Sequence, residues 1–171
     1  DRDTTPPTTT KTVGEPKIAC DYLNDGERPV EVCWFITSDT TIGFIAKDYD
    51  PGDQEFSDQE KIFYRTRWKL NWEDPWSPWS EVKEYSGLIQ FAEDSFHEIE
   101  YWSEDWCGNE EDHHYEIDIV DNKPPVTTKT VGDPKVPGDG FTWITQNTPI
   151  NLSCKDQQPH PVGVDNIQYR Y

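Results

Sequence analysis

One pattern of fifteen residues occurs twice in this chain of 171 residues, as DTTPPTTTKTVGEPK at 3–17 and as DNKPPVTTKTVGDPK at 121–135. Aligned at an offset of 118, the two copies share eleven identical residues, and Glu15 meets Asp133 with the same charge. A match this dense indicates an internal repeat, which limits the architecture more than any single residue does.

The similarity continues beyond the prolines. The segment WFITSDTTIGFIAKD (34–48) resembles TWITQNTPINLSCKD (142–156) at an offset of 108, and KIFYRTR is then matched by NIQYRY. Because the offset falls from 118 to 108, the first copy holds extra residues, mostly ACDYLNDGERPVEVC. We therefore predict one complete repeat at 1–120, with a hairpin insert at 18–33. Residues 121–171 are then a linker and the first strands of a second, incomplete repeat.

Short segments with alternating apolar residues favour strands over helices. In TTIGFIA the residues Ile42, Phe44 and Ala46 share one face, and the second copy keeps this parity with Ile150, Leu152 and Cys154 at the matching positions. This face is predicted to be the core. The same alternation places His97, Ile99 and Tyr101 inward with Trp102 outward, and it places Tyr115, Ile117 and Ile119 inward. The pattern predicts an all-β protein built as an antiparallel sandwich.

Composition restricts the environment and the partners. Thirty-four acidic and fifteen basic residues give a formal charge of -19, which argues against nucleic acid or an anionic membrane as a partner. No stretch approaches the roughly 18 apolar residues of a membrane helix, so no membrane insertion is expected. The chain begins without Met or a signal peptide, which we interpret as a processed or excised segment.

Four cysteines favour disulfides and an extracellular location. Cys20 and Cys33 bracket the turn signal NDG, so they are predicted to staple a hairpin, the alternative being two unpaired thiols. The sequence does not assign partners to Cys107 and Cys154.

The order of several motifs carries a resemblance. YRTRW, then Trp79 and EYSG, then HEIEYWSEDWCGNEE and finally DNKPP resemble the immunoglobulin-like (fibronectin-type) β-sandwich repeats of bacterial and archaeal cell-surface proteins. The resemblance covers nearly all of residues 1–121 and the first half of the second copy. It implies an immunoglobulin-like sandwich that serves as a spacer, adhesin stalk, surface-layer piece or filament subunit. The chain departs from the family at Ser95-Phe96, where a glycine is usual, and in its disulfide-bracketed insert.

Calcium is the cation that the acidic segments favour, since it takes several carboxylate and carbonyl oxygens. One candidate is the loop DYDPGDQE, and its ligands would be Asp48, Asp50, Asp53 and Glu55. The other is the junction DIVDNKPP, which is similar to the acidic linkers of cadherins; its ligands would be Asp118, Asp121 and Asn122, joined by Asp105 or Glu104. The alternative is that these residues only cap turns and solvate the linker.

No nucleophile motif, phosphate-binding glycine loop or HExxH motif occurs, so no enzyme is expected. His113 and His114 are adjacent and would point to opposite faces of a strand, which disfavours a shared zinc ion; we predict an exposed pair in a turn. His97 is predicted to be a hydrogen-bonded core residue.

Clustered tryptophans predict an exposed contact patch for proteins or sugars, or a cover over one end of the sandwich; its members would be Trp72, Trp76, Trp79 and Trp102. Asn151 lies in the sequon NLS and is a candidate glycosylation site on the outward face of a strand.

Taken together, the residues predict a structural extracellular protein. It would be part of a cell-surface filament, array or stalk that contacts copies of itself through residues 121–171. The alternatives are an adhesin module that binds carbohydrate or another ligand through the tryptophan patch, and an accessory domain of an enzyme.

Overall fold

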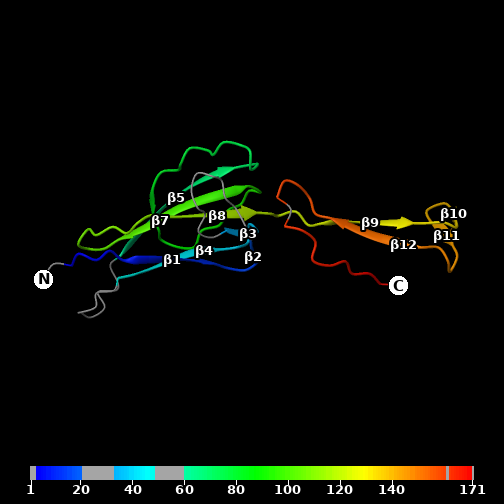
Figure 1. Cartoon of the computed structure of the whole chain (residues 1–171), viewed down its shortest axis with the longest axis horizontal. Helices are drawn as coiled ribbons and strands as arrows, with labels where there is room; N and C mark the ends of the chain where they lie inside the picture. The colour runs from blue at the N-terminus through cyan, green and yellow to red at the C-terminus, as the bar shows by residue number, and fades with distance from the viewer. Residues whose placement is uncertain (1–2, 21–32, 49–59, 161, 171) are drawn as a thin grey trace. The chain divides into compact units, whose positions relative to one another are not determined.

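The fold is all-β, as the sequence predicts. The computed structural model describes residues 3–20, 33–48, 60–160 and 162–170, and within these ranges it contains twelve strands and no helix. No helix among the described residues could therefore cross a membrane. The chain divides into two compact units, Asp1–Asn122 and Lys123–Tyr171 (Figure 1).

Unit 1 is a sandwich of two sheets. Its strands are β1 (Thr8–Val13), β2 (Lys17–Ala19), β3 (Cys33–Ile36), β4 (Ile42–Lys47), β5 (Lys61–Lys69), β6 (Lys83–Glu84), β7 (Phe96–Glu104) and β8 (His114–Val120). Strands β1 and β4 form one antiparallel sheet, and the other has the order β2-β3-β8-β7-β5-β6. All pairs in the larger sheet are antiparallel except β3 with β8, which is parallel. Figure 1 shows β1 and β4 along one side of this unit and β5, β7 and β8 along the other.

The core lies between these two sheets. Ile42 and Phe44 of β4 pack with Ile99 and Tyr101 of β7 and with Val120 of β8, all of them buried. The ring centroid of Phe44 is 4.8 Å from that of Tyr101. The inward faces predicted for β4 and β7 are therefore confirmed, because each alternates between a side chain in this core and one on the opposite face of its sheet.

The inward face predicted for β8 is wrong. Ile117 and Ile119 belong to a second apolar cluster, with Cys33 and Phe96, against which Trp72 and Trp76 pack. The residues of β8 that face the β1-β4 sheet are the alternate ones, including Val120. Both faces of β8 are buried, so an alternating pattern cannot by itself tell which face meets the main core.

Unit 2 contains four strands, β9 (Val126–Val131), β10 (Lys135–Pro137), β11 (Thr142–Ile144) and β12 (Ile150–Lys155). They repeat β1 to β4 pair by pair. The partners Thr9 and Ala46 in unit 1 become Thr127 and Cys154 in unit 2. The Oγ1 atom of Thr40 donates to the Pro16 carbonyl at 2.6 Å, and that of Thr148 donates to the Pro134 carbonyl at 2.5 Å. The repeat thus extends from sequence to register and hydrogen bonding.

Glycine is needed at the same turn of each copy. The amide of Gly14 donates to the Thr41 carbonyl at 2.8 Å, and the amide of Gly132 donates to the Pro149 carbonyl at 2.9 Å. A Cβ atom at Gly14 would lie 2.8 Å from Thr41 Oγ1, and one at Gly132 would lie 2.6 Å from Pro149 Cγ. A side chain at either glycine would therefore collide with the residue that faces it across the turn.

The change of offset has a structural explanation at one connection. The amide of Cys20 donates to the Cys33 carbonyl at 3.1 Å, and in unit 2 the amide of Gly138 donates to the Phe141 carbonyl at 2.8 Å. Two residues, 139 and 140, therefore stand where unit 1 has the twelve residues 21–32. Gly140 has a φ of 75°, which favours glycine in this short turn. The predicted NDG turn lies outside the described residues.

Cys20 and Cys33 form a disulfide with a Cα–Cα distance of 5.3 Å. Cys20 follows β2 directly and Cys33 is the first residue of β3, so the bond ties these two paired strands together at the base of the insert. In unit 2 the equivalent positions hold Gly138 and Phe141, and a short turn connects the paired strands β10 and β11.

Candidate functional site

The most unusual surface of the protein is the face of unit 2 that corresponds to the core of unit 1. Ile42 is fully buried, while its equivalent Ile150 is 50% exposed. Ile36 is 2% exposed, while its equivalent Ile144 is 46% exposed. We call this surface the open face, and its residues are Thr127, Lys129, Ile144, Ile150 and Leu152. These residues belong to two separate two-stranded sheets, β9-β12 and β10-β11, and the described part of unit 2 contains no counterpart of β5–β8 to pack against them.

In unit 1 the equivalent face is covered by β5, β7 and β8. The segment of unit 2 that matches the start of β5 is NIQYR (166–170), which is described but forms no strand. Its apolar residues Ile167 and Tyr169 are 37% and 73% exposed, while their equivalents Ile62 and Tyr64 pack against the core of unit 1. We call β1–β4 the front half of unit 1 and β5–β8 its back half. The described residues of unit 2 correspond to the front half and contain no counterpart of the back half.

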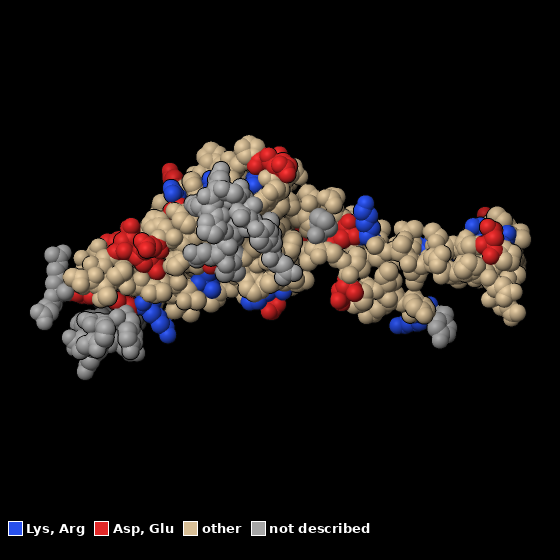
Figure 2. Space-filling model, viewed as in Figure 1, with Lys and Arg blue, Asp and Glu red and all other residues tan. Residues whose placement is uncertain are grey.

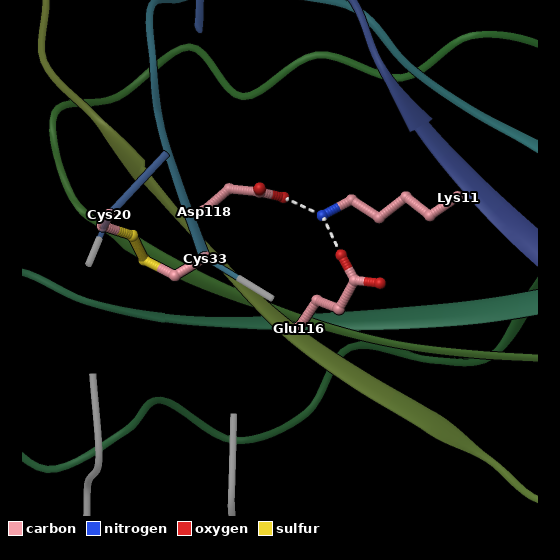
Figure 3. The surroundings of a disulfide bond; sticks show 5 residues. All are labelled: Lys11, Cys20, Cys33, Glu116 and Asp118. Atoms are coloured by element: carbon pink, nitrogen blue, oxygen red, sulfur yellow. Dashed lines mark hydrogen bonds and ion pairs between the residues drawn. A yellow bond between two sulfur atoms is a disulfide. The ribbon is translucent and has the colours of Figure 1, made fainter. Parts of the chain in front are cut away.

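The interface between the two halves of unit 1 contains a buried lysine. The Nζ atom of Lys11 on β1 lies 3.0 Å from Oε2 of Glu116 and 2.7 Å from Oδ2 of Asp118, both on β8. The three side chains are 1%, 8% and 0% exposed. Figure 3 shows the lysine reaching between the two carboxylates, with the disulfide nearby. The inward face of β8 is thus acidic, and the front half supplies its countercharge.

Burial raises the pKa of the Asp118 carboxyl, the charge of Lys11 lowers it, and the nearby Glu116 charge raises it; the net direction is upward. The folded state therefore ionises Asp118 less readily than the unfolded chain does. Removing one partner of such a buried set leaves a charge with neither water nor countercharge, which costs several kcal/mol. The lysine and the acidic strand therefore require each other.

A third acidic residue, Glu111, also joins the two sheets of unit 1. Oε2 of the buried Glu111 accepts from the Thr9 amide at 2.9 Å. Oε1 of Glu111 accepts from the amide and hydroxyl of Ser103 at 2.7 and 2.8 Å. Burial alone would raise the pKa of this carboxyl, but hydrogen bonds from Thr9, Ser103 and His114 outweigh it, so the pKa falls below its ordinary value of 4.5. Glu111 is thus held ionised against the edge of β1.

The strand TTKTV is identical in β1 and β9, yet its inward residues have different surroundings. Thr9 is 4% exposed and the Lys11 side chain 1% exposed, whereas Thr127 and Lys129 are both exposed.

Unit 2 also differs from unit 1 in net charge. Residues 123–171 contain five basic and four acidic residues, formally +1, which leaves -20 for residues 1–122. Figure 2 shows acidic side chains gathered in patches on the surface of unit 1.

The predicted calcium ligands of the junction are not brought together. Asp118 binds Lys11 inside unit 1, so its assignment as a cation ligand is wrong for this structure. The side chain of Asn122 is also engaged within unit 1, because Oδ1 accepts from the Ser38 amide at 2.8 Å and Nδ2 donates to the Ala92 carbonyl at 3.3 Å. The amide of Asp121 donates to the Ile36 carbonyl at 2.9 Å.

Two other predicted ligands meet at a different place. Asp48 and Asp105 form a cluster with Asp3, in which one carboxylate oxygen of each lies within 4.8 Å of the others. Asp105 accepts from the amide and the side chain of Asn109 at 2.8 and 2.7 Å, so these bonds also shape the turn. The remaining predicted ligands Asp50, Asp53 and Glu55 lie outside the described residues. Calcium binding stays a prediction.

The tryptophan patch is different from the one predicted. Trp102 is only 8% exposed, because Phe63 and His113 stack on its two sides, so its place in an exposed patch is wrong. The other three rings are half-buried over the outer face of β5 and β7. The Nζ atom of Lys69 lies 4.1 Å from the ring centroid of Trp72. The Cζ atoms of Arg65 and Arg67 lie 4.8 and 4.6 Å from the ring centroid of Trp79. The Cζ atom of Arg67 also lies 4.9 Å from the ring centroid of Trp76.

Those arginines in turn bind the acidic residues of β7, Arg65 with Glu100 and Arg67 with Glu98. Glu100 is buried, which by itself would raise its pKa, but hydrogen bonds from Arg65, His113 and Tyr115 lower it overall. The tryptophans therefore cover charged residues on the outer face of the sheet, whereas the alternative considered for the sequence was a cover over one end of the sandwich.

The histidines act as structural residues in the described contacts. The rings of His113 and His114 are half-buried and lie against different partners, so the predicted exposed pair is wrong. Nδ1 of His113 is 2.6 Å from Glu100 Oε1, and His114 stacks on Tyr101 with centroids 5.0 Å apart. His97 is buried, as predicted, with Nε2 2.8 Å from the Ser95 hydroxyl.

Asn151 is exposed on β12, on the side opposite the open face, because it alternates with Ile150 and Leu152. A glycan there would not obstruct that face, and glycosylation remains a prediction. Cys107 and Cys154 are free thiols in this structure.

Sequence reasoning missed the role of Lys11. The signal that could have found it is parity, since Lys11 alternates with Thr9 and Val13 opposite Ala46, Phe44 and Ile42. A lysine at an inward position predicts a buried acidic partner, and HYEIDIV offers two carboxylates at alternate positions.

No protein-family model, curated protein or solved structure was found to match this chain.

Proposed function

We propose that this chain is a segment of a structural extracellular protein built from tandem immunoglobulin-like sandwiches, part of a stalk, surface array or filament. The observation that carries the proposal is the repetition of β1–β4 as β9–β12 with the same register and the same turn hydrogen bonds. Repetition of a structural segment along one chain is typical of proteins that build extended, quasi-linear objects.

Three features of unit 1 support this role. A disulfide ties β2 to β3, which suits an oxidising environment outside the cell. The formal charge of -20 on residues 1–122 suits a solvated surface that repels other acidic surfaces. Three buried charged residues, Lys11, Glu100 and Glu111, make contacts that join strands. A non-enzymatic role is part of the proposal.

The test is where the native protein occurs and what form it takes. An antibody raised against residues 1–122 should label the outside of intact source cells. Electron micrographs of the detached, labelled material should show extended objects with a regular spacing of domains. Labelling confined to the cell interior, or labelled material that consists only of compact single particles, would contradict the proposal.

A ligand-binding adhesin remains the alternative, but no observation in the structure favours it. The tryptophans on which it depends are packed against cations and apolar side chains of their own unit.

A further inference from the structure

We propose that the open face of unit 2 is a docking site for an acidic back half supplied from outside residues 1–171. Its central strand would carry the inward pattern of β8, two carboxylates at alternate positions followed by an aliphatic residue. This inference deepens the proposed function by naming the partner of the repeat. It depends only on the two units and not on where the protein occurs.

The first argument is that the molecule itself shows what covers such a face. In unit 1, Ile42 of β4 is buried against the sheet that contains β5, β7 and β8, and Ile36 of β3, the neighbour of β8 in that sheet, is buried in the same core. In unit 2 the same strands leave Ile150 and Ile144 about half exposed. Exposed apolar surface on a sheet with free edges is where additional strands dock.

The second argument is the free edge of β11. In unit 1, β3 pairs with β2 on one side and with β8 in parallel on the other, and the pair Ile36 with Val120 ends this ladder. In the described residues of unit 2, β11 pairs only with β10. A strand added in parallel to β11 would place its aliphatic residue opposite Ile144, and its backbone would form the hydrogen bonds of strand addition.

The third argument is charge. Lys11 is buried only because Glu116 and Asp118 meet it, and its equivalent Lys129 is exposed. A neutral or basic strand on the open face would bury the Lys129 ammonium without a countercharge, which is strongly unfavourable. A strand with carboxylates at the two positions of Glu116 and Asp118 would restore the buried contact found in unit 1.

The described strands of one copy of residues 1–171 do not supply this back half to another copy. Each copy has two front halves, β1–β4 and β9–β12, but only one back half, β5–β8, among its described strands. Transferring β5–β8 to a neighbour would uncover one front half for each one covered. Pairing two open faces directly would place Lys129 against a face that offers a second Lys129 and no inward carboxylate.

The test supplies the missing half to the full chain. Residues 1–171 are extended by a second copy of residues 67–122, because residues 166–170 already repeat the beginning of β5. Hydrogen exchange is compared between the original and the extended chain. We expect the amides of Thr142–Ile144 in β11 to exchange at least about tenfold more slowly in the extended chain.

Charge dependence is tested with matched variants of the extended chain. Lys129→Met, or Glu116→Gln with Asp118→Asn in the added copy only, should abolish most of this protection while leaving exchange in the original β7 unchanged. A variant that loses protection in both units has lost its fold. A combined variant then provides the test, in which Lys129 and the two added carboxylates are all replaced by apolar residues. Recovery of protection in that combined variant supports the buried charge contact.

Two results would overturn the inference. One is unchanged exchange in β11 on extension. The other is a stable dimer of the original chain in sedimentation, with β11 already protected, because this would make a second copy the occupant. Failure of the cell-surface labelling would count against the proposed function alone, since these measurements use purified protein.

Discussion

The Nζ atom of Lys11 lies 2.7 Å from Oδ2 of Asp118, and both side chains are closed off from solvent between the two sheets of unit 1. The identical lysine of unit 2, Lys129, is exposed. The same strand sequence therefore has two environments within one chain, and this provides a built-in control for the energetic role of the lysine.

Replacing Lys11 with Met should destabilise unit 1 by about 3–5 kcal/mol, because Glu116 and Asp118 lose their countercharge in a buried site. Replacing Lys129 with Met should change the stability of residues 1–171 by no more than about 0.5 kcal/mol, as for other exposed positions. Urea unfolding followed by tryptophan fluorescence is a suitable measurement, because seven of the eight tryptophans are in unit 1. Equal effects of the two substitutions would contradict the assigned role of Lys11.

The loss of stability caused by Lys11→Met should also depend on pH. Burial already raises the pKa of Asp118, and Lys11 opposes that rise, so removing Lys11 raises this pKa further. A carboxyl with a raised pKa favours folding at low pH and loses that contribution as pH rises. The difference between wild type and variant should therefore be larger at pH 7 than at pH 4. A difference that is constant over this range would argue against a buried charge effect.

Replacing Glu111 with Gln should cost about 1–3 kcal/mol at pH 7, because the Thr9 and Ser103 donors lose an ionised acceptor. The pKa of Glu111 is lowered in the folded state, so its contribution is fully present above its ordinary pKa of 4.5 and is lost as pH falls through the lower folded value. The wild-type advantage should thus shrink between pH 6 and pH 3. Glu110→Gln, at an exposed neighbouring residue, serves as the control and should have little effect.

Replacing both Cys20 and Cys33 with Ser should lower the stability of unit 1 by about 3 kcal/mol in the chain-entropy model for a loop of this length. Exchange in β9–β12 should stay unchanged, because Gly138 and Phe141 stand at the equivalent positions there. Peptide mapping without reductant should recover the two cysteines as one linked pair, and recovery of two free thiols would refute the bond itself.

Replacing Trp72 with Ala should destabilise unit 1 by about 2–3 kcal/mol, since its half-buried ring packs on Phe96 at 5.4 Å and covers Lys69. Trp106→Ala should be nearly neutral, because that ring is 83% exposed. Thermal unfolding by circular dichroism distinguishes the two. If Trp72 instead serves a sugar-binding patch, its removal would abolish glycan binding on an array and leave the melting temperature unchanged.

The sequence by itself determined the strand content, the repeat and the inward face of β4. Ile42, Phe44 and their equivalents could be assigned because a half-buried strand alternates strictly and the second copy repeats the parity. The pairing of Cys20 with Cys33 followed from a turn signal between them. The strands and the disulfide depend on residues close together in the chain, where backbone geometry limits the possibilities, and the repeat needs only a comparison of the sequence with itself.

Only the tertiary structure decided the contacts that join distant segments. Lys11 meets Asp118 across 107 residues of sequence, and no local pattern reports that distance. Both faces of β8 are buried, so alternation alone does not report that its acidic side faces the β1-β4 sheet. Trp102 is buried by Phe63 and His113, which come from other parts of the chain. The open face of unit 2 is likewise a tertiary property, because the same strand sequence is buried in unit 1 and exposed in unit 2 according to what packs against it.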